Sequence, residues 1–274
     1  MQPIPVPPQN EIDFSSALKA AEETALEAGE LLIERFFKPR TTRQKGPRDL
    51  VTDADGSAEE LIRSRLLRQF PQCQFMGEES WQGGQVLPDG LVWVIDPLDG
   101  TTNYSQRYPV FSVSIGLMYN SEIALGVVYD PMQKHLFSTR RGAGAYCAGE
   151  KLHVGSAPNL ADAVVGLDWG REKSVRERMV EVFPRLLMQS ETLRSGGSTA
   201  LGLCYVAAGW LDAYFHFSPS LWDIAAGTLI AEEAGSVVSD LQGNQWQPES
   251  INVLAANAAV HAELLEFVRE ASKQ

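Results

Sequence analysis

The apolar run LVWVI at residues 91–95 is the feature that most constrains the fold of this chain. Consecutive apolar residues without polar alternation are typical of a strand that is buried on both faces. Apolar residues recur at helical spacing over 14–36, and 57–70 shows a second amphipathic helical pattern. Two further strand-like runs, 111–119 and 122–130, are joined by a short turn. The first half therefore mixes helices with hairpin-connected strands.

The second half also mixes strands and helices, and a boundary is predicted near Pro158. Residues 162–170 are strand-like, whereas 199–212 and 220–235 show apolar helical patterns. The organisation that we predict is an extended lead-in at 1–13, an N-terminal α+β subdomain at 14–157 and a C-terminal α/β subdomain at 158–274.

Composition argues against several classes of partner. The formal net charge is −12, from 23 basic and 35 acidic residues in a chain of 274. Such a protein repels nucleic acid and anionic membranes, which are polyanions. The cysteines at 73, 147 and 204 are widely spaced without a CxxC pair, which predicts packing roles in a reducing compartment. With no signal peptide at the start and no apolar run of membrane-spanning length, we predict a cytoplasmic protein.

Two carboxylates follow the apolar strand in the sequence VWVIDPLDGTTNY. An Asp-Pro step should end the strand sharply, and Asp96 and Asp99 would then point the same way from the following turn. Two nearby like charges are unfavourable unless a cation lies between them, and carboxylate oxygens suit Mg²⁺. Gly100 would permit close approach of a phosphate to the start of a helix. Turn and helix capping by the two acids explains this stretch equally well.

Three further acidic clusters could either bind a metal ion or stabilise the local turns and helix starts. N-capping accounts for at least one acid before the helix at 57–70, and the helix dipole alone accounts for an acid in a first turn. The clusters are Asp49, Asp53 and Asp55 in DLVTDAD, Glu78 and Glu79 in GEES, and Asp223 in SLWDIAAG.

The order and spacing of four motifs resemble the inositol monophosphatase family of lithium-sensitive, Mg²⁺-dependent inositol and sugar phosphatases. The motifs are DLVTDAD, GEES, WVIDPLDGTTNY and WDIAAGTLIAEEAG, and the resemblance runs from about residue 15 to the last helix. It implies an α+β fold, a layered αβαβα sandwich with mixed, largely antiparallel sheets. It also implies a homodimer, a small phosphorylated polyol or sugar as substrate, and two to three Mg²⁺ ions per active site.

The same resemblance assigns roles residue by residue. Glu78, Asp96 and the carbonyl of Leu98 would hold one Mg²⁺ ion, and Asp96, Asp99 and Asp223 a second, with a third, looser ion near Glu78. The catalytic set would be Asp55, Thr101 and Glu78, of which Asp55 and Thr101 orient and activate the attacking water. The phosphate and substrate would contact Asp99, Gly100, Thr101, Thr102, Thr199 and His216.

Two positions depart from the family pattern. His216 stands where inositol phosphatases often carry a glutamate that meets the inositol ring, and either a strand histidine or a ligand fits this position. Thr199 stands where a small alanine is common. Lys45, four residues before Asp49, either steers phosphate or is a solvated loop lysine.

The function that we predict is hydrolysis of inositol monophosphate by direct attack of a metal-activated water, with no covalent phosphoenzyme. Fructose-1,6-bisphosphatase or histidinol-phosphatase activity on the same fold is the alternative, including dual specificity. A non-catalytic regulatory homologue is the alternative from another class, but such a protein would be expected to lack a ligand carboxylate, and here all are present.

Overall fold

The computed structural model describes residues 12–38, 42–46, 49–82, 84 and 87–271, so most of the predicted lead-in lies outside the described residues. The helices are α1 (Phe14–Phe36), α2 (Asp53–Gln69), α3 (Thr101–Ser105), α4 (Lys173–Leu187), α5 (Thr199–Ala207), α6 (Leu221–Glu233), α7 (Ala258–Ala271) and the 3₁₀ turn η1 (Leu160–Asp162). The strands are β1 (Thr42–Gly46), β2 (Asp49–Thr52), β3 (Gln74–Gly77), β4 (Leu91–Asp99), β5 (Ser112–Tyr119), β6 (Glu122–Asp130), β7 (His135–Arg140), β8 (Ala145–Cys147), β9 (Glu150–Lys151), β10 (Val164–Asp168), β11 (Thr192–Arg194), β12 (Ala213–His216), β13 (Val237–Ser239) and β14 (Val253–Ala256).

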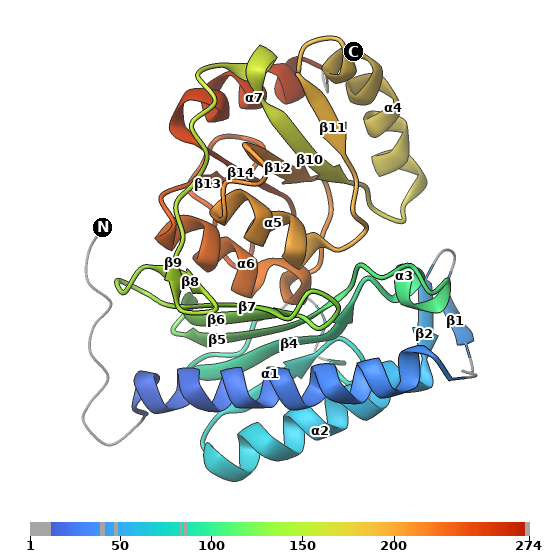
Figure 1. The fold of residues 1–274 in the computed structure, drawn as a ribbon, viewed down its shortest axis with the longest axis vertical. Coiled ribbons are helices and arrows are strands. Elements are labelled where there is room, and N and C mark those ends of the chain that lie inside the picture. The colour runs from blue at the N-terminus through green and yellow to red at the C-terminus, as the bar shows by residue number, and fades with distance from the viewer. Residues whose placement is uncertain (1–11, 39–41, 47–48, 83, 85–86, 272–274) are drawn as a thin grey trace.

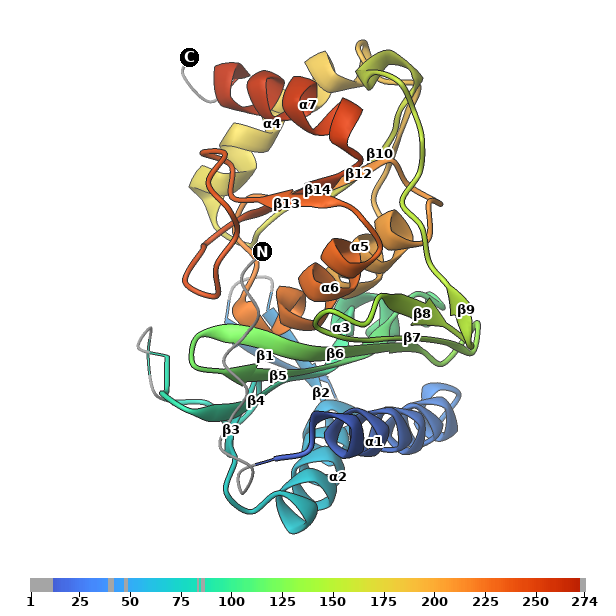
Figure 2. The ribbon, with the colours of Figure 1, turned by 90° about the vertical axis from the view of Figure 1, so that its left-hand side faces the viewer.

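Helices and sheets alternate in layers (Figures 1 and 2). Helices α1 and α2 cover one face of a seven-stranded sheet of order β3-β4-β5-β6-β7-β8-β9. Helices α5 and α6 lie between it and a five-stranded sheet of order β11-β10-β12-β14-β13, whose far face carries α4 and α7. Only β3–β4, β10–β11 and β10–β12 pair in parallel among the strand pairs of these two sheets in the described chain. The predicted αβαβα sandwich is confirmed.

The two sheets fall on opposite sides of the predicted boundary at residue 157/158. Helices α5 and α6 from the second half nevertheless pack on strands of the first, such as β6. The division into two subdomains therefore stays a prediction. No helix of the described ranges is both long and apolar enough to cross a membrane.

Strand β4 lies between β3 and β5 and ends at the site, and its nine residues are all buried, as predicted for LVWVI. It does not end at Asp96, however. The strand continues to Asp99, and its pairing with β5 shifts register between Asp96 and Asp99. Pro97 lies within this irregularity and has no N–H to pair. The expected sharp exit is therefore wrong: the two carboxylates project from a bulged strand end and not from a turn.

Helix α6 packs very closely on β5 and β6 because glycines face it. A Cβ added at Gly126 would lie 2.7 Å from the carbonyl oxygen of Ala226, and one at Gly116 would lie 3.3 Å from the Cβ of Ala225. The first residues of α6 are also fastened to β5, since the hydroxyl of Ser114 donates to the carbonyl of Trp222 at 3.2 Å. Ser114 pairs with Asp96 across the sheet. The start of α6 is thereby held beside the bulged end of β4.

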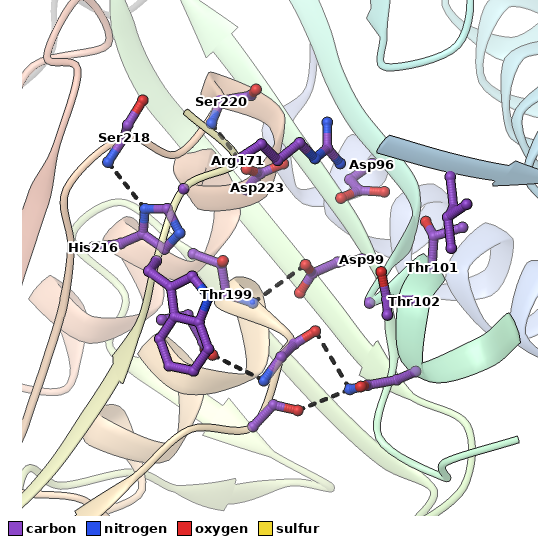
Figure 3. A pocket seen from close by; sticks show the side chains of 18 of the residues that line it. Asp96, Asp99, Thr101, Thr102, Arg171, Thr199, His216, Ser218, Ser220 and Asp223 are labelled. Atoms are coloured by element: carbon purple, nitrogen blue, oxygen red, sulfur yellow. Dashed lines mark hydrogen bonds between the residues drawn. The ribbon is translucent and has the colours of Figure 1, made fainter. Parts of the chain in front are cut away.

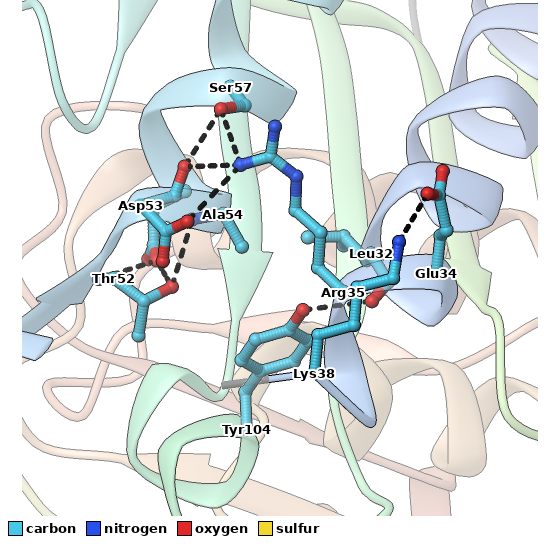
Figure 4. A network of polar contacts seen from close by, with 10 residues as sticks. Leu32, Glu34, Arg35, Lys38, Thr52, Asp53, Ala54, Ser57 and Tyr104 are labelled. Atoms are coloured by element: carbon cyan, nitrogen blue, oxygen red, sulfur yellow. Dashed lines mark hydrogen bonds and ion pairs between the residues drawn. The ribbon is translucent and has the colours of Figure 1, made fainter. Parts of the chain in front are cut away.

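A polar network joins the end of α1 to α2 and α3 (Figure 4). Nη1 of Arg35 donates to the carbonyl of Asp53 at 3.0 Å and to the hydroxyl of Ser57 at 2.8 Å. The hydroxyl of Tyr104 donates to the carbonyl of Leu32 at 2.8 Å. These bonds hold the start of α2 and the short helix α3 against one common support.

We expect Gly126→Ala to destabilise the protein by about 1–3 kcal/mol, because its methyl group meets helix backbone that cannot rotate away. Gly56→Ala is the matched control: it lies in α2, where an added Cβ meets nothing within 4 Å. This control should stabilise by about 0.5–1 kcal/mol through helix propensity. Urea unfolding followed by tryptophan fluorescence measures both, and equal effects of the two substitutions would contradict the close packing of α6.

Candidate active site

A cavity of about 630 Å³ opens where the bulged end of β4 meets α3 and the first residues of α5 and α6. It is large enough for a small-molecule substrate. Most of the residues singled out from the sequence line it: Glu78, Asp96, Leu98, Asp99, Gly100, Thr101, Thr102, Thr199, His216 and Asp223. Asp55 reaches it through Thr101. Figure 3 shows the cavity with seven of these residues labelled, from the two halves of the chain: Asp96, Asp99, Thr101, Thr102, Thr199, His216 and Asp223.

Asp96 is one of the two acids of the group whose pKa is raised well above its usual value. Its side chain is buried, and one carboxylate oxygen accepts from the N–H of Leu98 at 2.9 Å. Burial raises the pKa of Asp96 well above its usual value, and the charges of Glu78, Asp99 and Asp223 raise that pKa further. Four acids therefore repel one another around one buried space.

Asp99 is held by the start of α5, more than ninety residues away along the chain. Its Oδ1 accepts from the N–H of Thr199 at 3.2 Å, and its Oδ2 from the N–H of Ala200 at 2.9 Å and the hydroxyl of Ser198. Burial raises the pKa of Asp99 to about 6, although these three hydrogen bonds oppose that rise. The hydroxyl of Ser198 is therefore engaged with this carboxylate.

Asp55 and Thr101 are brought together as predicted. The hydroxyl of Thr101 lies 3.1 Å from Oδ1 of Asp55 and 3.1 Å from the carbonyl oxygen of Leu98. Oδ2 of Asp55 accepts from the N–H of Thr52 at 2.8 Å and from its hydroxyl at 2.6 Å, which closes a capping box at the start of α2. The predicted capping and the predicted contact with Thr101 are thus made by different oxygens of one carboxylate. Burial raises the pKa of Asp55.

Asp223 also combines a cap with a place in the cavity. Its Oδ2 accepts from the N–H of Ser220 at 2.8 Å in the capping box of α6. Burial and the charges of Glu78 and Asp99 raise the pKa of Asp223 well above its usual value, whereas Arg171 lowers it. Nη2 of Arg171 lies 3.9 Å from Oε1 of Glu78. Arg171 is therefore a cation that lies close to this group of acids.

Gly100 has the backbone that the predicted phosphate contact needs. Its φ is 99°, in the left-handed region, and a Cβ there would lie 3.1 Å from the carbonyl oxygen of Val110. Thr101 and Thr102 follow as the first residues of α3.

Asp53, another acid of the motifs, does not join this group. Asp53 turns towards Arg35, with 3.4 Å between Oδ2 and Nη1. The side chains of Lys45 and Asp49 lie outside the described residues.

Sequence reasoning missed Asp168, which lines the cavity from the end of β10. Its Oδ1 accepts from the hydroxyl of Ser195 at 2.6 Å and the N–H of Gly197 at 3.1 Å, and its Oδ2 from the hydroxyl of Tyr214 at 3.0 Å. Asp168 thus orders the loop that leads into α5. The available signal was the same as for Asp96, a carboxylate directly after an apolar strand.

His216 is more buried than the sequence suggested, with only 6% of its surface exposed at the end of β12. Its Nδ1 accepts from the N–H of Ser218 at 3.1 Å (Figure 3). Burial, with a smaller effect of Arg171, lowers the pKa of His216 to about 4.

A model of the inositol monophosphatase family matches residues 13–273 of this sequence. The chain belongs to the inositol monophosphatase family. It is 37% identical over 256 residues to "Inositol monophosphatase 2" of Solanum lycopersicum, covering 91% of this chain and 97% of the relative. It is 36% identical to "Nus factor SuhB" of Xylella fastidiosa, covering 92% and 94%. The solved suhB structure from Bartonella henselae superposes with a TM-score of 0.87 at 29% identity, covering 93% and 99%. Family membership identifies the protein as a phosphatase.

The donor chemistry of the cavity fits the metal dependence of this family. Carboxylate and carbonyl oxygens are the ligands of hard divalent cations, and mutual repulsion of four acids is relieved by such cations. Within the described part of the chain, no three His, Cys, Asp or Glu side chains form a closed metal cluster. Like charges that repel one another are expected to remain apart, so we expect cation binding to draw the carboxylates together.

We expect the metal-free protein to lose stability as pH rises. The pKa of Asp99 is raised from 3.8 to about 6, so its contribution is fully present below about 3.8 and is lost as pH rises through about 6. At pH 7.5, Asp96→Asn should therefore raise the melting temperature of the metal-free protein by ~2–4 °C, or about 1 kcal/mol, because it removes a buried like charge. Differential scanning calorimetry in a chelator measures this.

The control for that experiment is Asp89→Asn, a change at an exposed acid away from the cavity. It should leave the melting temperature unchanged. A metal-free Asp96→Asn protein less stable than wild type would show that repulsion among these acids is not the dominant effect.

Proposed function

We propose that this protein is a Mg²⁺-dependent phosphomonoesterase that hydrolyses inositol monophosphate by direct attack of an activated water. The observation that carries the proposal is the contact between Asp55 and Thr101 beside the group of four acids. A proton acceptor next to a strongly negative, cation-requiring cavity is the arrangement that hydrolysis of a phosphate ester needs.

Two sets of residues would hold the metal ions. Glu78, Asp96 and the carbonyl of Leu98 form one set, and Asp96, Asp99 and Asp223 the other, so Asp96 belongs to both. When bound, Mg²⁺ supplies charge neutralisation of the phosphate and Lewis-acid activation of water. The number of ions, the third and looser ion near Glu78 and sensitivity to lithium stay predictions, as do the homodimer and the cytoplasmic location.

The proton path follows from the hydrogen bonds of Asp55. Oδ2 is occupied by both donors of Thr52, so Oδ1 is the oxygen that can take a proton. The hydroxyl of Thr101 has one proton, and when it donates that proton to Oδ1 its lone pairs face the cavity. A water held there can pass its proton through the threonine hydroxyl to the carboxylate as its oxygen attacks phosphorus.

The phosphate would lie at Gly100, Thr101 and Thr102. The left-handed backbone of Gly100 leaves little room for a side chain, and the first residues of α3, whose N–H groups would contact the phosphate, line the cavity. Such N–H groups bind anions. The remaining part of the cavity, bounded by Thr199, His216 and residues 168–172, would receive the leaving group.

Fructose-1,6-bisphosphatase or histidinol-phosphatase activity remains the alternative within this fold, and Arg171 is the observation that favours a more anionic substrate. The name "Nus factor SuhB" of one relative raises a regulatory role. The complete set of acids at 55, 78, 96, 99 and 223 supports catalysis, whether or not a second role exists.

We expect release of inorganic phosphate from inositol 1-phosphate to require Mg²⁺. Asp55→Asn and Thr101→Ala should each lower kcat by about 10²–10⁴, since each removes a member of the proton path. Asp53→Asn is the matched control, because this neighbouring acid faces Arg35 instead, and it should retain activity. A chelator-resistant activity, or equal losses at positions 53 and 55, would refute the proposed roles.

Rapid quenching during turnover tests the direct attack, and no phosphorylated protein should accumulate. Hydrolysis in ¹⁸O-labelled water should place one solvent oxygen in each phosphate, which shows that the P–O bond is cleaved. Trapping of a phosphorylated side chain would replace direct attack with a two-step mechanism.

A further inference from the structure

The hydrogen bond from Ser218 fixes which nitrogen of His216 carries a proton. Nδ1 accepts a backbone N–H at 3.1 Å and therefore has no hydrogen. A neutral imidazole must then carry its proton on Nε2, which makes this atom a donor. The low pKa of His216, about 4, keeps the ring neutral near pH 7.

Nε2 of His216 is the ring nitrogen that a substrate in the cavity can reach. The residue is 94% buried by its 6% exposure, it lines the cavity, and none of the described residues provides Nε2 with a hydrogen-bond acceptor. A substrate acceptor at this position would take the hydrogen bond that Nε2 offers.

The neighbouring segment between β10 and α4 adds positive charge on the same wall. Arg171 and Arg176 both line the cavity, and Nε of Arg176 donates to the carbonyl of Gly170 at 3.2 Å, which orders this loop. Asp168 lies on this wall too, but both its oxygens already accept hydrogen bonds. Glu172 is the one further acid among the described residues of this segment, and it is exposed at the rim.

We propose that His216 and Arg171 form a leaving-group subsite that recognises a second anionic group, phosphate or carboxylate, on the phosphomonoester substrate. The inference rests on the proposed phosphomonoesterase activity, and within that activity it ranks a substrate with a second anionic group above inositol monophosphate. A carboxylate side chain at position 216 would accept hydrogen bonds from polyol hydroxyls. His216 offers a donor instead. The guanidinium of Arg171, which lines the same cavity 3.9 Å from Oε1 of Glu78, favours an acceptor that carries negative charge.

The subsite ranks the candidate substrates. Fructose 1,6-bisphosphate presents a second phosphate to it, inositol 1-phosphate presents neutral hydroxyls, and histidinol phosphate presents an ammonium group that Arg171 repels. We expect kcat/KM to decrease in that order, with at least tenfold between the first two. 3-Phosphoglycerate, which carries a carboxylate, separates recognition of phosphate from recognition of any anion.

The variants His216→Gln and His216→Glu test the donor, because they have the same shape and differ in what they present. Glutamine keeps an N–H donor and should hold the bisphosphate-to-monophosphate ratio of kcat/KM within threefold. Glutamate presents a negative acceptor and should lower that ratio at least tenfold. Arg171→Gln should lower it as well. General structural damage would reduce turnover of both substrates together and would leave the ratio unchanged.

The outcomes separate this inference from the proposed function. If inositol 1-phosphate is hydrolysed, the phosphatase activity stands. The subsite is then overturned by a bisphosphate-to-monophosphate ratio of kcat/KM near one in the wild type, or by a ratio that His216→Glu leaves unchanged. If no phosphomonoester is cleaved, the proposed function fails. The subsite is then judged by calorimetry with fructose 1,6-bisphosphate, where equal affinity of wild type and His216→Glu overturns it and at least tenfold weaker binding supports it.

Discussion

The repulsion between buried carboxylates at the end of β4 is the constraint around which this molecule is arranged. Asp96 and Asp99 are buried and Asp223 is half-buried beside them, and their like charges raise the pKa values of Asp96 and Asp223. The fold offsets part of this cost with helix N-termini. Asp223 caps α6, Asp99 accepts from the first N–H groups of α5, and Asp55 caps α2. Each carboxylate thus meets the positive end of a helix dipole, which favours its charged form. The remaining repulsion is what makes the cavity a place for cations.

The layered architecture brings the first residues of these three helices together around the cavity. Helix α2 comes from the outer layer, whereas α5 and α6 come from the layer between the two sheets. Strand β4 must end beneath them, and its register shift around Pro97 turns both carboxylates towards the cavity. The close approach of α6 at Gly126 and the bonds of Arg35 to the start of α2 are supports of the same arrangement. Contacts far from the cavity therefore determine where its charges lie.

Local features of the sequence predicted much of this, and distant contacts account for what it did not predict. The helix over Phe14–Phe36, the buried strand and the acids of the motifs could all be predicted from periodicity, spacing and resemblance. The bulge at Pro97 could not, because it depends on pairing with β5. Asp168 was missed since its importance comes from Ser195, Gly197 and Tyr214, which no local pattern connects to it. The tautomer of His216 likewise depends on one backbone N–H beyond the end of its strand.

The carboxylate of Asp55 both caps α2 and contacts Thr101, and a substitution can separate these two roles. An asparagine at this position has one oxygen and one NH₂ group. Both donors of Thr52 point at the position of Oδ2, so the cap requires the amide oxygen there. The NH₂ group must then face Thr101, where the mechanism needs a proton acceptor. The cap of α2 thus orients the amide so that the helix start is retained while the acceptor becomes a donor. Loss of chemistry and loss of fold are separable at this residue because the two oxygens have different partners.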